Sequence, residues 1–332
     1  MEVIDWNGKP IKKPGVYRRI PLAKYHSQDI CDGPSVSSTN LRRVLECNGG
    51  SPAHFWDEWS GNPNGAEPEE KDHHVLGRAA HHLILGEPNF RKHYIDRPLE
   101  FNDWRSAASR DWREAAEARG FTVVTQKDLE IIVGMARSIE NTILRPDDDS
   151  EKEMVVRELL GGKIECSFIW FDKPSGLWIK SRPDAVPSDS GQFVDLKTCT
   201  SVQYRDMASA VTDWSYHQQA ALVAEGARIC AGISPADFSF VLLFCEKKRP
   251  YCVRAVEMKQ DQIALGIMQN RHALWLIARG LREKRWPGPG GNRQIEHVDL
   301  HKYYQDNAEH ELGVIENMIE LERKAGPTRK RA

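Results

Sequence analysis

The sequence predicts an α/β protein whose central mixed β-sheet is flanked by helices. Segments rich in β-forming residues cluster in the middle of the chain. They are residues 153–159, 163–171, 177–182 and 192–198. A helical pattern at 213–230 follows them, and further strands are expected at 238–245 and 251–257. A helix inserted between strands in this way is typical of a sheet covered by helices and argues against a barrel.

Helical patterns account for most of the remaining chain. The expected helices are residues 39–45, 73–85, 106–119, 126–144, 259–284 and 305–324. Thr125 is placed to cap the fourth of these helices, and the Pro- and Gly-rich run at 286–291 stops the fifth. We therefore expect three parts: an N-terminal extension packed on the core (1–75), a core (76–290), and a C-terminal helix with a basic tail (291–332).

Composition narrows the class of protein. Of the 332 residues, 40% are hydrophobic and 28% are charged, as in an ordinary globular protein. The formal net charge is −2, so any contact with nucleic acid must come from local clusters of Lys and Arg. The seven cysteines form no C-x-x-C pair, which indicates a reducing compartment and argues against a zinc finger or an iron–sulfur cluster. Without a long apolar run or a signal-peptide pattern, we expect a cytoplasmic protein with no membrane contact.

One group of residues carries most of the chemical information. Asp184 closes one expected strand, Asp195-Leu196-Lys197 lies on the next, and Glu165 lies on the strand before. Side chains on a strand alternate between its faces, so Asp195 and Lys197 project to the same side. Mg²⁺ is usually held by one or two carboxylates plus a substrate phosphate, and a lysine can position a water or neutralise charge on that phosphate. The pattern predicts metal-assisted hydrolysis of a phosphodiester; the alternative is a solvated strand end.

Contacts with DNA require cations near these acids, and Lys180 and Arg182 are the best local choices. Residues 180, 182 and 184 share parity on one expected strand, so both cations should project to the face of Asp184. The alternative is a pair of solvent-facing cations that balance nearby acids. Arg42-Arg43 and the basic tail at 329–331 are the next places to look.

The order of these motifs resembles the PD-(D/E)xK nuclease superfamily, and most closely its exonuclease VIII (RecE-like) phage recombination exonucleases. No single motif is specific, and the resemblance rests on their order and spacing over most of the chain. The matching segments are Tyr25-His26, Ser35 to Ser38, Ser51 to His54, Gly77 to Leu85, Glu165 to Ser167, Gly176 to Asp184, Val194 to Thr198 and Tyr216 to Ala220. The resemblance implies a PD-(D/E)xK (restriction-endonuclease-like) core.

The resemblance also assigns a metal site. The implied ligands are His81, Glu165, Asp184, Asp195 and the backbone carbonyl of Leu196. His82 is the neighbour that could be confused with His81, but it projects about 100° further around the helix. Because like charges repel, we expect that replacing Asp184 or Asp195 leaves stability in EDTA unchanged or raises it.

The remaining implied catalytic residues are Lys197, which would orient the attacking water, and Gln219 in the following helix. The family's Q-x-x-x-Y pattern fails here, because Val223 stands where a tyrosine is expected. Tyr216 lies one turn before Gln219 and could substitute on the same helix face, in contact with DNA.

The resemblance implies a Mg²⁺-dependent exodeoxyribonuclease, with Mn²⁺ as a substitute, that acts on duplex ends. It implies 5′-to-3′ polarity, release of single strands for recombination, a ring-like homo-oligomer and a RecT-like single-strand annealing partner in the host cytoplasm. The alternatives are an endonuclease or repair nuclease of the same superfamily, or a DNA-binding scaffold that keeps the fold without cutting. A scaffold would usually have lost an acid or the lysine, and this chain keeps them all.

Overall fold

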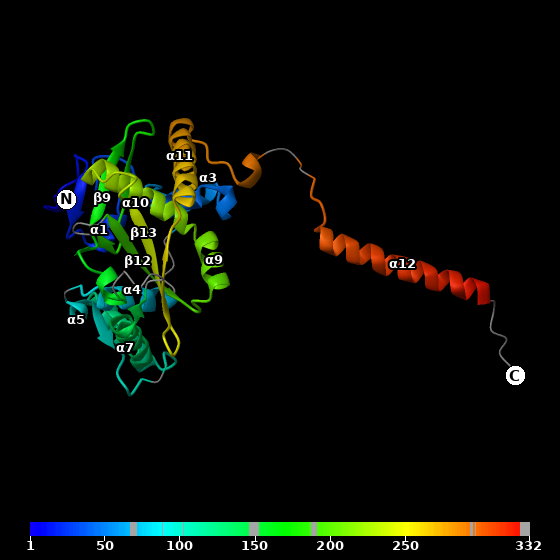
Figure 1. Ribbon diagram of the computed structural model, residues 1–332, viewed down its shortest axis with the longest axis horizontal. Helices are drawn as coiled ribbons and strands as arrows, with labels where there is room; N and C mark the ends of the chain where they lie inside the picture. The colour runs from blue at the N-terminus through cyan, green and yellow to red at the C-terminus, as the bar shows by residue number, and fades with distance from the viewer. Residues whose placement is uncertain are drawn as a thin grey trace. The chain divides into compact units, whose positions relative to one another are not determined.

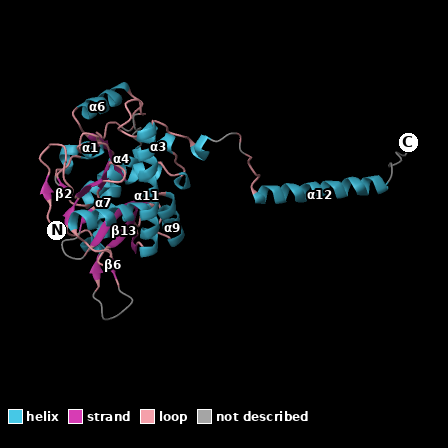
Figure 2. Ribbon diagram, turned by 90° about the horizontal axis from the view of Figure 1, so that it is seen from above, coloured by secondary structure: helices cyan, strands magenta, loops and turns pink. Residues whose placement is uncertain are grey.

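The computed structural model describes residues 1–66, 72–87, 89–101, 103–145, 153–186, 191–292, 295 and 297–325. The chain forms two compact units, Met1–Pro289 and Gly290–Ala332. The first unit contains both large sheets, and the second consists mainly of one helix (Figures 1 and 2). Within the described ranges, no helix combines the length and the apolar character needed to cross a membrane.

Most strands belong to two five-stranded mixed sheets. The first sheet, in spatial order, is β1 (Ile4–Asp5), β2 (Gly15–Arg18), β9 (Ser167–Asp172), β10 (Leu177–Ser181) and β3 (Ser35–Ser37). The second is β14 (Val253–Glu257), β13 (Ser239–Glu246), β12 (Gln192–Cys199), β11 (Ala185–Val186) and β8 (Lys163–Ile164). Two short pairs remain, β4 (Tyr94–Asp96) with β5 (Thr122–Val124), and β6 (Ile143–Leu144) with β7 (Met154–Val155). The predicted mixed α/β class is confirmed, but the strands are divided between two sheets.

The helices of the first unit are α1 (Leu22–His26), α2 (Ser38–Arg43), α3 (Pro52–Glu58), α4 (Asp72–Ile84), α5 (Phe90–His93), α6 (Ala107–Ala118), α7 (Gln126–Asn141), α8 (Val156–Leu159), α9 (Tyr204–Asp213), α10 (Tyr216–Ala231) and α11 (Gln260–Glu283). Short 3₁₀ turns are η1 (Glu46–Asn48) and η2 (Pro289–Asn292), and α12 (Lys302–Ala325) lies in the second unit. The predicted cap of α7 is confirmed, because the Thr125 hydroxyl accepts a 3.1 Å hydrogen bond from the N–H of Asp128. The basic tail at 329–331 lies outside the described residues.

The chain passes between the two sheets twice. It leaves β8 for β9 at Glu165-Cys166, and it leaves β10 for β11 at Arg182–Asp184. The predicted strand 163–171 is therefore interrupted, and the predicted strand 177–182 ends at Ser181. Both crossings carry residues that the sequence assigned to the site.

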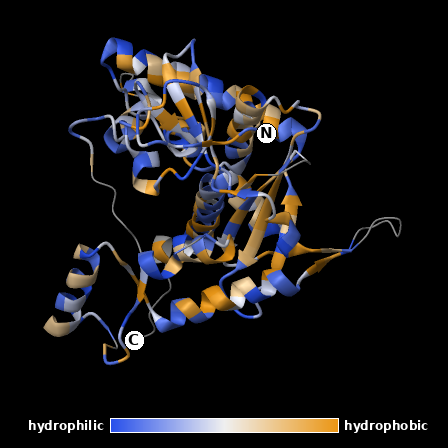
Figure 3. Cartoon of the chain, turned by 90° about the vertical axis from the view of Figure 1, so that its left-hand side faces the viewer, coloured by the Kyte–Doolittle hydropathy of each residue, from blue (hydrophilic) through white to orange (hydrophobic). Residues whose placement is uncertain are grey.

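The paired strands β12 and β13 separate two hydrophobic cores. The strands are parallel, with Val194 opposite Val241, so alternate side chains face opposite sides. The aromatic side of these strands packs under α10 and α11, and the aliphatic side packs against α4 and α7 (Figure 1). Figure 3 shows the central strands as mostly hydrophobic, whereas the helices around them carry residues of both kinds. This burial on both faces holds β12 rigidly where the acids project.

One further predicted strand is wrong, and one helix was not expected. Residues 153–159 were expected as one strand, but β7 ends at Val155 and a helical turn, α8, follows. The fully buried side chain of Val156 packs into the core beside α7, and this packing overrides the β propensity of a Val pair. The predicted helix 213–230 corresponds to α10, which begins at Tyr216 after the left-handed Ser215 (φ 49°), and the separate helix α9 before it was not expected.

We predict that Gly266→Ala destabilises the protein. A Cβ at this position would lie 2.5 Å from the backbone oxygen of His217 and 2.8 Å from the Cβ of Ala221, so α10 and α11 would have to separate. The free energy of unfolding, measured by urea denaturation, should fall by about 1–3 kcal/mol.

Gly77→Ala in α4 is the matched control. The nearest atom to its added Cβ is the Thr198 hydroxyl oxygen at 3.9 Å, an ordinary contact. Removing a glycine from a helix interior should then raise stability by about 0.5–1 kcal/mol. Equal effects of the two replacements would contradict the close contact at Gly266.

Candidate functional site

Asp184 and Asp195 face each other at the end of a β-ladder. Ala185 of β11 pairs antiparallel with Val194 of β12, so one further step places Asp184 opposite Asp195. The carboxylate of Asp184 accepts a 2.6 Å hydrogen bond from the N–H of Leu196. Both aspartates are buried, at 7% and 2% exposure, so two acids share a small volume with little water.

The sequence explains why the ladder stops here. The next residue of this strand, Pro183, would lie opposite Leu196, and proline has no N–H to donate to the Leu196 carbonyl. Where the ladder stops, the side chain of Asp184 accepts from the Leu196 N–H in place of a carbonyl of the neighbouring strand. In a strand, the N–H and C=O of one residue point to the same edge, so the carbonyl of Leu196 points to the edge where β11 is missing. Beyond Val194, β12 therefore offers an open edge on this side.

Lys197 completes a triangle with Asp195 and Gln219. Its Nζ forms an ion pair with the carboxylate of Asp195 and donates to Oε1 of Gln219 at 3.0 Å. The amide of Gln219 in turn donates to the other carboxylate oxygen of Asp195 at 2.8 Å. The ring of Tyr216, also from α10, lies 4.3 Å from the Lys197 ammonium. The structure thus brings Lys197, Gln219 and Tyr216 to the two acids.

The two neighbouring histidines of α4 have different surroundings. Nδ1 of His81 lies 3.3 Å from the carboxylate of Asp184. His82 points away, with its Nδ1 3.7 Å from Glu87 and its ring against Phe90. The structure therefore brings His81, and not His82, to the acids.

Glu165 occupies the other crossing between the sheets. It has a left-handed φ of 54°, and its N–H donates to the carbonyl of Asp184 at 3.0 Å. Its carboxylate lies 3.8 Å from the guanidinium of Arg182. Burial and the nearby charge of Asp184 raise the pKa of Glu165 to about 8. Glu165 is thus beside Asp184, on the side away from Asp195.

The two central acids have opposite pKa shifts. Burial and the charge of Asp184 raise the pKa of Asp195 above its usual value, although Lys197 opposes them. Burial also acts to raise the pKa of Asp184, but His81, Lys197 and the Leu196 N–H outweigh it and hold that pKa below its usual value. Without a metal ion, Asp195 is therefore the acid that takes up a proton first.

The pKa values of Lys197 and His81 are both raised. Burial alone would lower the pKa of Lys197, but the charges of Asp195, Tyr216 and Asp184 raise it above its usual value. Burial likewise acts against the charged form of His81, and Asp184 outweighs it, so the pKa of His81 is raised. At neutral pH, Lys197 is an ammonium ion that can donate hydrogen bonds but cannot accept a proton.

The donor set fits a hard divalent cation that shares its coordination with a substrate. Among the described residues, no three His, Cys, Asp or Glu side chains are arranged to hold a metal ion by themselves. Mg²⁺, however, is usually bound through one or two carboxylates, with waters and substrate phosphate filling the other positions. Asp184, Asp195 and the open-edge carbonyl of Leu196 supply such a partial set of oxygens.

The expectation for Lys180 and Arg182 is wrong. The expectation that residues 180, 182 and 184 share one face requires one continuous strand as far as Asp184, but β10 ends at Ser181. Lys180 is 3% exposed, and its ammonium donates to the carbonyls of Tyr25 and Ser27 at 2.7 and 3.4 Å. Burial lowers the pKa of Lys180 to about 8. This side chain ties the N-terminal segment to β10 and is not available to a phosphate.

Arg182 also points into the protein. Its side chain is 9% exposed, and its guanidinium donates to the hydroxyl of Ser167 at 2.8 Å and to the carbonyl of Ile20 at 3.1 Å. The same group lies 4.2 Å from the centre of the Tyr25 ring. Its contacts support the crossing between the sheets.

Sequence reasoning missed the role of Arg42 beside this site. Arg42 donates to the backbone carbonyl of Trp214, just before the left-handed Ser215. Burial lowers the pKa of Arg42, and the charges of Tyr216 and Asp195 oppose this, so the three groups lie close together. No local pattern signals this contact, because Arg42 and Trp214 are separated by most of the chain.

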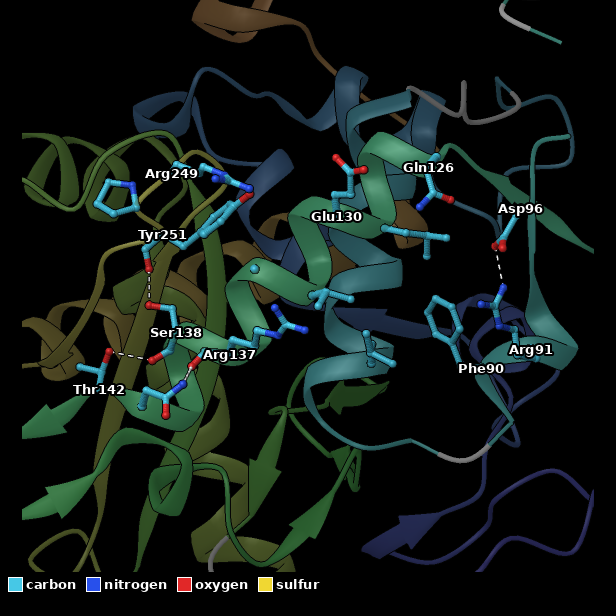
Figure 4. Close-up of a pocket in the computed structure, with 16 residues that line it drawn as sticks. Phe90, Arg91, Asp96, Gln126, Glu130, Arg137, Ser138, Thr142, Arg249 and Tyr251 are labelled. Carbon is cyan, nitrogen blue, oxygen red and sulfur yellow. Dashed lines mark hydrogen bonds and ion pairs between the residues drawn. The ribbon is translucent and has the colours of Figure 1, made fainter. Parts of the chain in front are cut away.

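A cavity lies in another part of the first unit. It has a volume of about 1000 Å³ and lies along α7, between α5 and the turn at 249–251 (Figure 4). Figure 4 shows the ion pair between Arg91 and Asp96 on one side of the cavity. Arg249 and Tyr251 line the other side. None of the residues that line it belongs to the group around Asp184, so the site is an open strand edge and not part of this cavity.

The family of PDDEXK-like domains of unknown function (DUF3799) matches residues 37–298. The chain belongs to this family. The expected PD-(D/E)xK superfamily and core are thereby confirmed. The matched region includes Asp184, Asp195 and Lys197, the residues on which the sequence argument depended.

Two solved structures match the chain to different degrees. A crystal structure described as that of a candidate exonuclease from Eubacterium rectale is similar, with a TM-score of 0.51 at 15% identity, covering 85% of this chain and 97% of that chain. An alkaline exonuclease from Laribacter hongkongensis matches with a TM-score of only 0.23 at 10% identity, covering 64% of this chain and 97% of that chain. The first likeness supports the fold, and the second carries no argument. No curated protein matches the sequence.

We predict opposite effects of Asp184→Asn and Asp195→Asn on stability in EDTA. The pKa of Asp184 is depressed in the folded state, so its charge stabilises the fold at pH 7, and this contribution is lost as pH falls through the folded pKa. The pKa of Asp195 is raised, so its contribution is present at low pH and is lost as pH rises through the folded pKa.

At pH 7, Asp184→Asn should therefore lower the Tm by a few degrees, and Asp195→Asn should leave it unchanged or raise it. Thermal unfolding followed by circular dichroism measures both. This replaces the expectation that either change is neutral or stabilising, because of the two aspartates only Asp184 has a pKa below its usual value. A higher Tm for Asp184→Asn would contradict this assignment.

Proposed function

We propose that this protein is a metal-dependent deoxyribonuclease that hydrolyses phosphodiester bonds from the ends of duplex DNA. The observation that carries the proposal is the position of Asp184 opposite Asp195 at an open strand edge, with the Lys197 ammonium beside them. Membership of the PDDEXK-like family supports the same chemistry.

The proposed cofactor is Mg²⁺, with Mn²⁺ as a substitute. The oxygens of Asp184, Asp195 and Leu196 would hold it, and Glu165 and His81 would lie at the edge of the metal site. Bound there, such an ion supplies an activated water and offsets charge on the phosphate. Glu165 has a raised pKa in the absence of metal, so an added positive charge would favour its ionised form.

Lys197 would act on charge that develops during the reaction. It remains an ammonium ion because Asp195 and Asp184 raise its pKa. It can therefore donate a hydrogen bond to a phosphate oxygen or to the attacking water as negative charge grows, which is where a preorganised donor is most effective. It would not serve as the base that removes a proton.

Gln219 and Tyr216 would keep Lys197 in place. The amide of Gln219 accepts from the ammonium and donates to Asp195, so one side chain fixes the distance between the cation and the acid. The Tyr216 ring contributes a cation–π contact at 4.3 Å. We therefore propose Gln219 as a positioning residue, and we keep Tyr216 as a DNA contact on the same helix face.

The finer features of the proposal rest on the resemblance to RecE-like exonucleases. They are 5′-to-3′ polarity, release of single strands for recombination, a homo-oligomer, a RecT-like annealing partner and a place in the cytoplasm, that of the host if the protein is phage-encoded. The candidate exonuclease from Eubacterium rectale, similar in fold, supports action at ends over internal cleavage.

The proposal is tested by incubating the protein with linear and with covalently closed circular duplex DNA, with Mg²⁺ and with EDTA. We expect degradation of the linear form only, and only with Mg²⁺. Nicking or linearisation of the circle would favour an endonuclease or repair nuclease. Binding of both forms without hydrolysis would favour a DNA-binding scaffold with a nuclease fold.

We further predict that Lys197→Ala slows the chemical step more than it weakens binding. Loss of one preorganised charge stabiliser should lower the single-turnover rate by about 10²-fold or more, while the Kd for duplex DNA in Ca²⁺ changes little. Lys173→Ala, which removes an exposed lysine between β9 and β10, is the control and should match wild type. A normal single-turnover rate with weakened binding would mean that Lys197 serves only as a phosphate clamp.

A further inference from the structure

A DNA-cleaving enzyme of this composition needs a local basic surface. The net charge of the chain is −2, so long-range attraction of a polyanion is weak. Lys180 and Arg182 make internal hydrogen bonds, and Arg43 is paired with Glu58 at 2.7 Å. We therefore consider cations in other described parts of the fold as contacts for the DNA backbone.

Arg254 lies in the same cross-strand row as the proposed catalytic lysine. Lys197 of β12 pairs with Phe244 of β13, and Phe244 pairs with Arg254 of β14. Directly paired residues project from the same face of a sheet, so Arg254 and Lys197 point to the same side. Two strand spacings separate them, which is about 10 Å. Arg254 therefore shares a sheet face with a residue of the site, which was wrongly expected of Lys180 and Arg182.

Three more exposed or partly exposed cations lie at the same end of the sheet. Lys247 and Lys248 form the turn between β13 and β14, and Arg205 lies in the first turn of α9. The turn is tied to the end of β12, because the N–H of Lys247 donates to the carbonyl of Cys199 at 2.9 Å. We use the name basic corner for the surface formed by these four cations, Arg205, Lys247, Lys248 and Arg254.

Hydrogen bonds connect the basic corner into one piece. The N–H of Val202, just before α9, donates to the carboxylate of Glu246 at 3.0 Å. The guanidinium of Arg254 donates to the carbonyl of the same Val202 at 3.4 Å. The segment that leads from the catalytic strand into α9 is thus fastened to β13 and β14. The four cations keep a fixed relation to Lys197.

The charge of this corner suits a polyanion. Two carboxylates, Asp206 and Glu246, lie on the same segments as the four cations. The Glu246 carboxylate already accepts a hydrogen bond from the N–H of Val202. Arg249 continues the basic run but lines the cavity along α7 (Figure 4), so we leave it out of the corner. Tyr204, at 73% exposure, adds an aromatic ring at the start of α9, and such rings accept nucleobases by stacking.

We propose that the basic corner binds the phosphate backbone of the DNA strand that leads away from the scissile bond. The inference rests on the proposed function, because it presumes a DNA substrate at Asp184 and Asp195. The two strand spacings of about 10 Å between Lys197 and Arg254 place the corner within reach of phosphates close to the scissile one. The corner holds the substrate and takes no part in the chemical step.

The test is a salt titration of binding to a duplex oligonucleotide in Ca²⁺, followed by fluorescence anisotropy. Each phosphate contact contributes about −0.9 to the slope of log K against log salt concentration. Arg254→Ala should therefore make the slope shallower by about 0.9, and the double replacement of Lys247 and Lys248 by Ala by about 1.8. Arg254→Lys should keep the wild-type slope, because a point charge is retained.

The matched control is the double replacement of Lys12 and Lys13 by Ala, which removes two adjacent exposed lysines near the N-terminus and should leave the slope unchanged. With saturating DNA and Mg²⁺, the corner variants should keep the wild-type kcat, while their KM rises at moderate salt. Thermal unfolding should show all variants to be as stable as wild type.

Three results would overturn the inference. Slopes equal to wild type in both corner variants would mean that this surface does not touch the backbone, and protein partners would become the better explanation for its charge. A drop in kcat at saturating DNA would place these cations in the chemistry. If the wild-type protein neither binds nor cleaves DNA, the proposed function fails first; if it cleaves normally and only the slopes are unchanged, this inference alone fails.

Discussion

A single hydrogen bond, from the N–H of Leu196 to the carboxylate of Asp184, holds the site together. A buried N–H that loses its partner is costly, by about 1–3 kcal/mol. Pro183 has no N–H for the Leu196 carbonyl and the ladder ends before it, so the buried Leu196 N–H needs an acceptor other than a carbonyl of the neighbouring strand. The acceptor it uses is a carboxylate, and the same bond therefore brings an acid opposite Asp195 and ends the ladder that would have covered it.

The other members of the site are arranged around this bond by different layers of the fold. α4 supplies His81 from the aliphatic side of the sheet, and α10 supplies Gln219 and Tyr216 from the aromatic side. Because β12 is packed on both faces, neither helix can shift without disturbing a core. The open edge of one strand is thus surrounded by rigid elements, which suits a site that must keep its geometry while a large substrate moves through it.

The central acids and Lys197 could be predicted from the sequence, because the alternation of side chains along one strand is a local property. The same argument failed for Lys180 and Arg182, since the chain leaves one sheet for the other between Ser181 and Ala185. Nothing in the local pattern distinguishes a crossing from a continuous strand. The alternation of side chains predicts a shared face only for residues of one unbroken strand.

Relations between distant strands could not be predicted at all. The row that joins Lys197 to Arg254 depends on the register of β12 with β13 and of β13 with β14, and register is set by packing and turn geometry. The contact of Arg42 with Trp214 likewise depends on the left-handed Ser215, a conformation that a serine seldom adopts. Sequence reasoning therefore recovered which residues meet at the candidate site, but not the side chains that lie around it.

The pairing of early strands with late ones has a consequence for biosynthesis. Val36 of β3 pairs with Ile179, and Val16 of β2 pairs with Phe168. At a translation rate of about 5–20 residues per second, β2 and β3 leave the ribosome roughly ten seconds before their partners exist. During that interval they are unpaired strand edges, and unpaired strand edges are sites of aggregation and of chaperone binding. The N-terminal residues depend for their own folding on the segment that brings Asp184 into place.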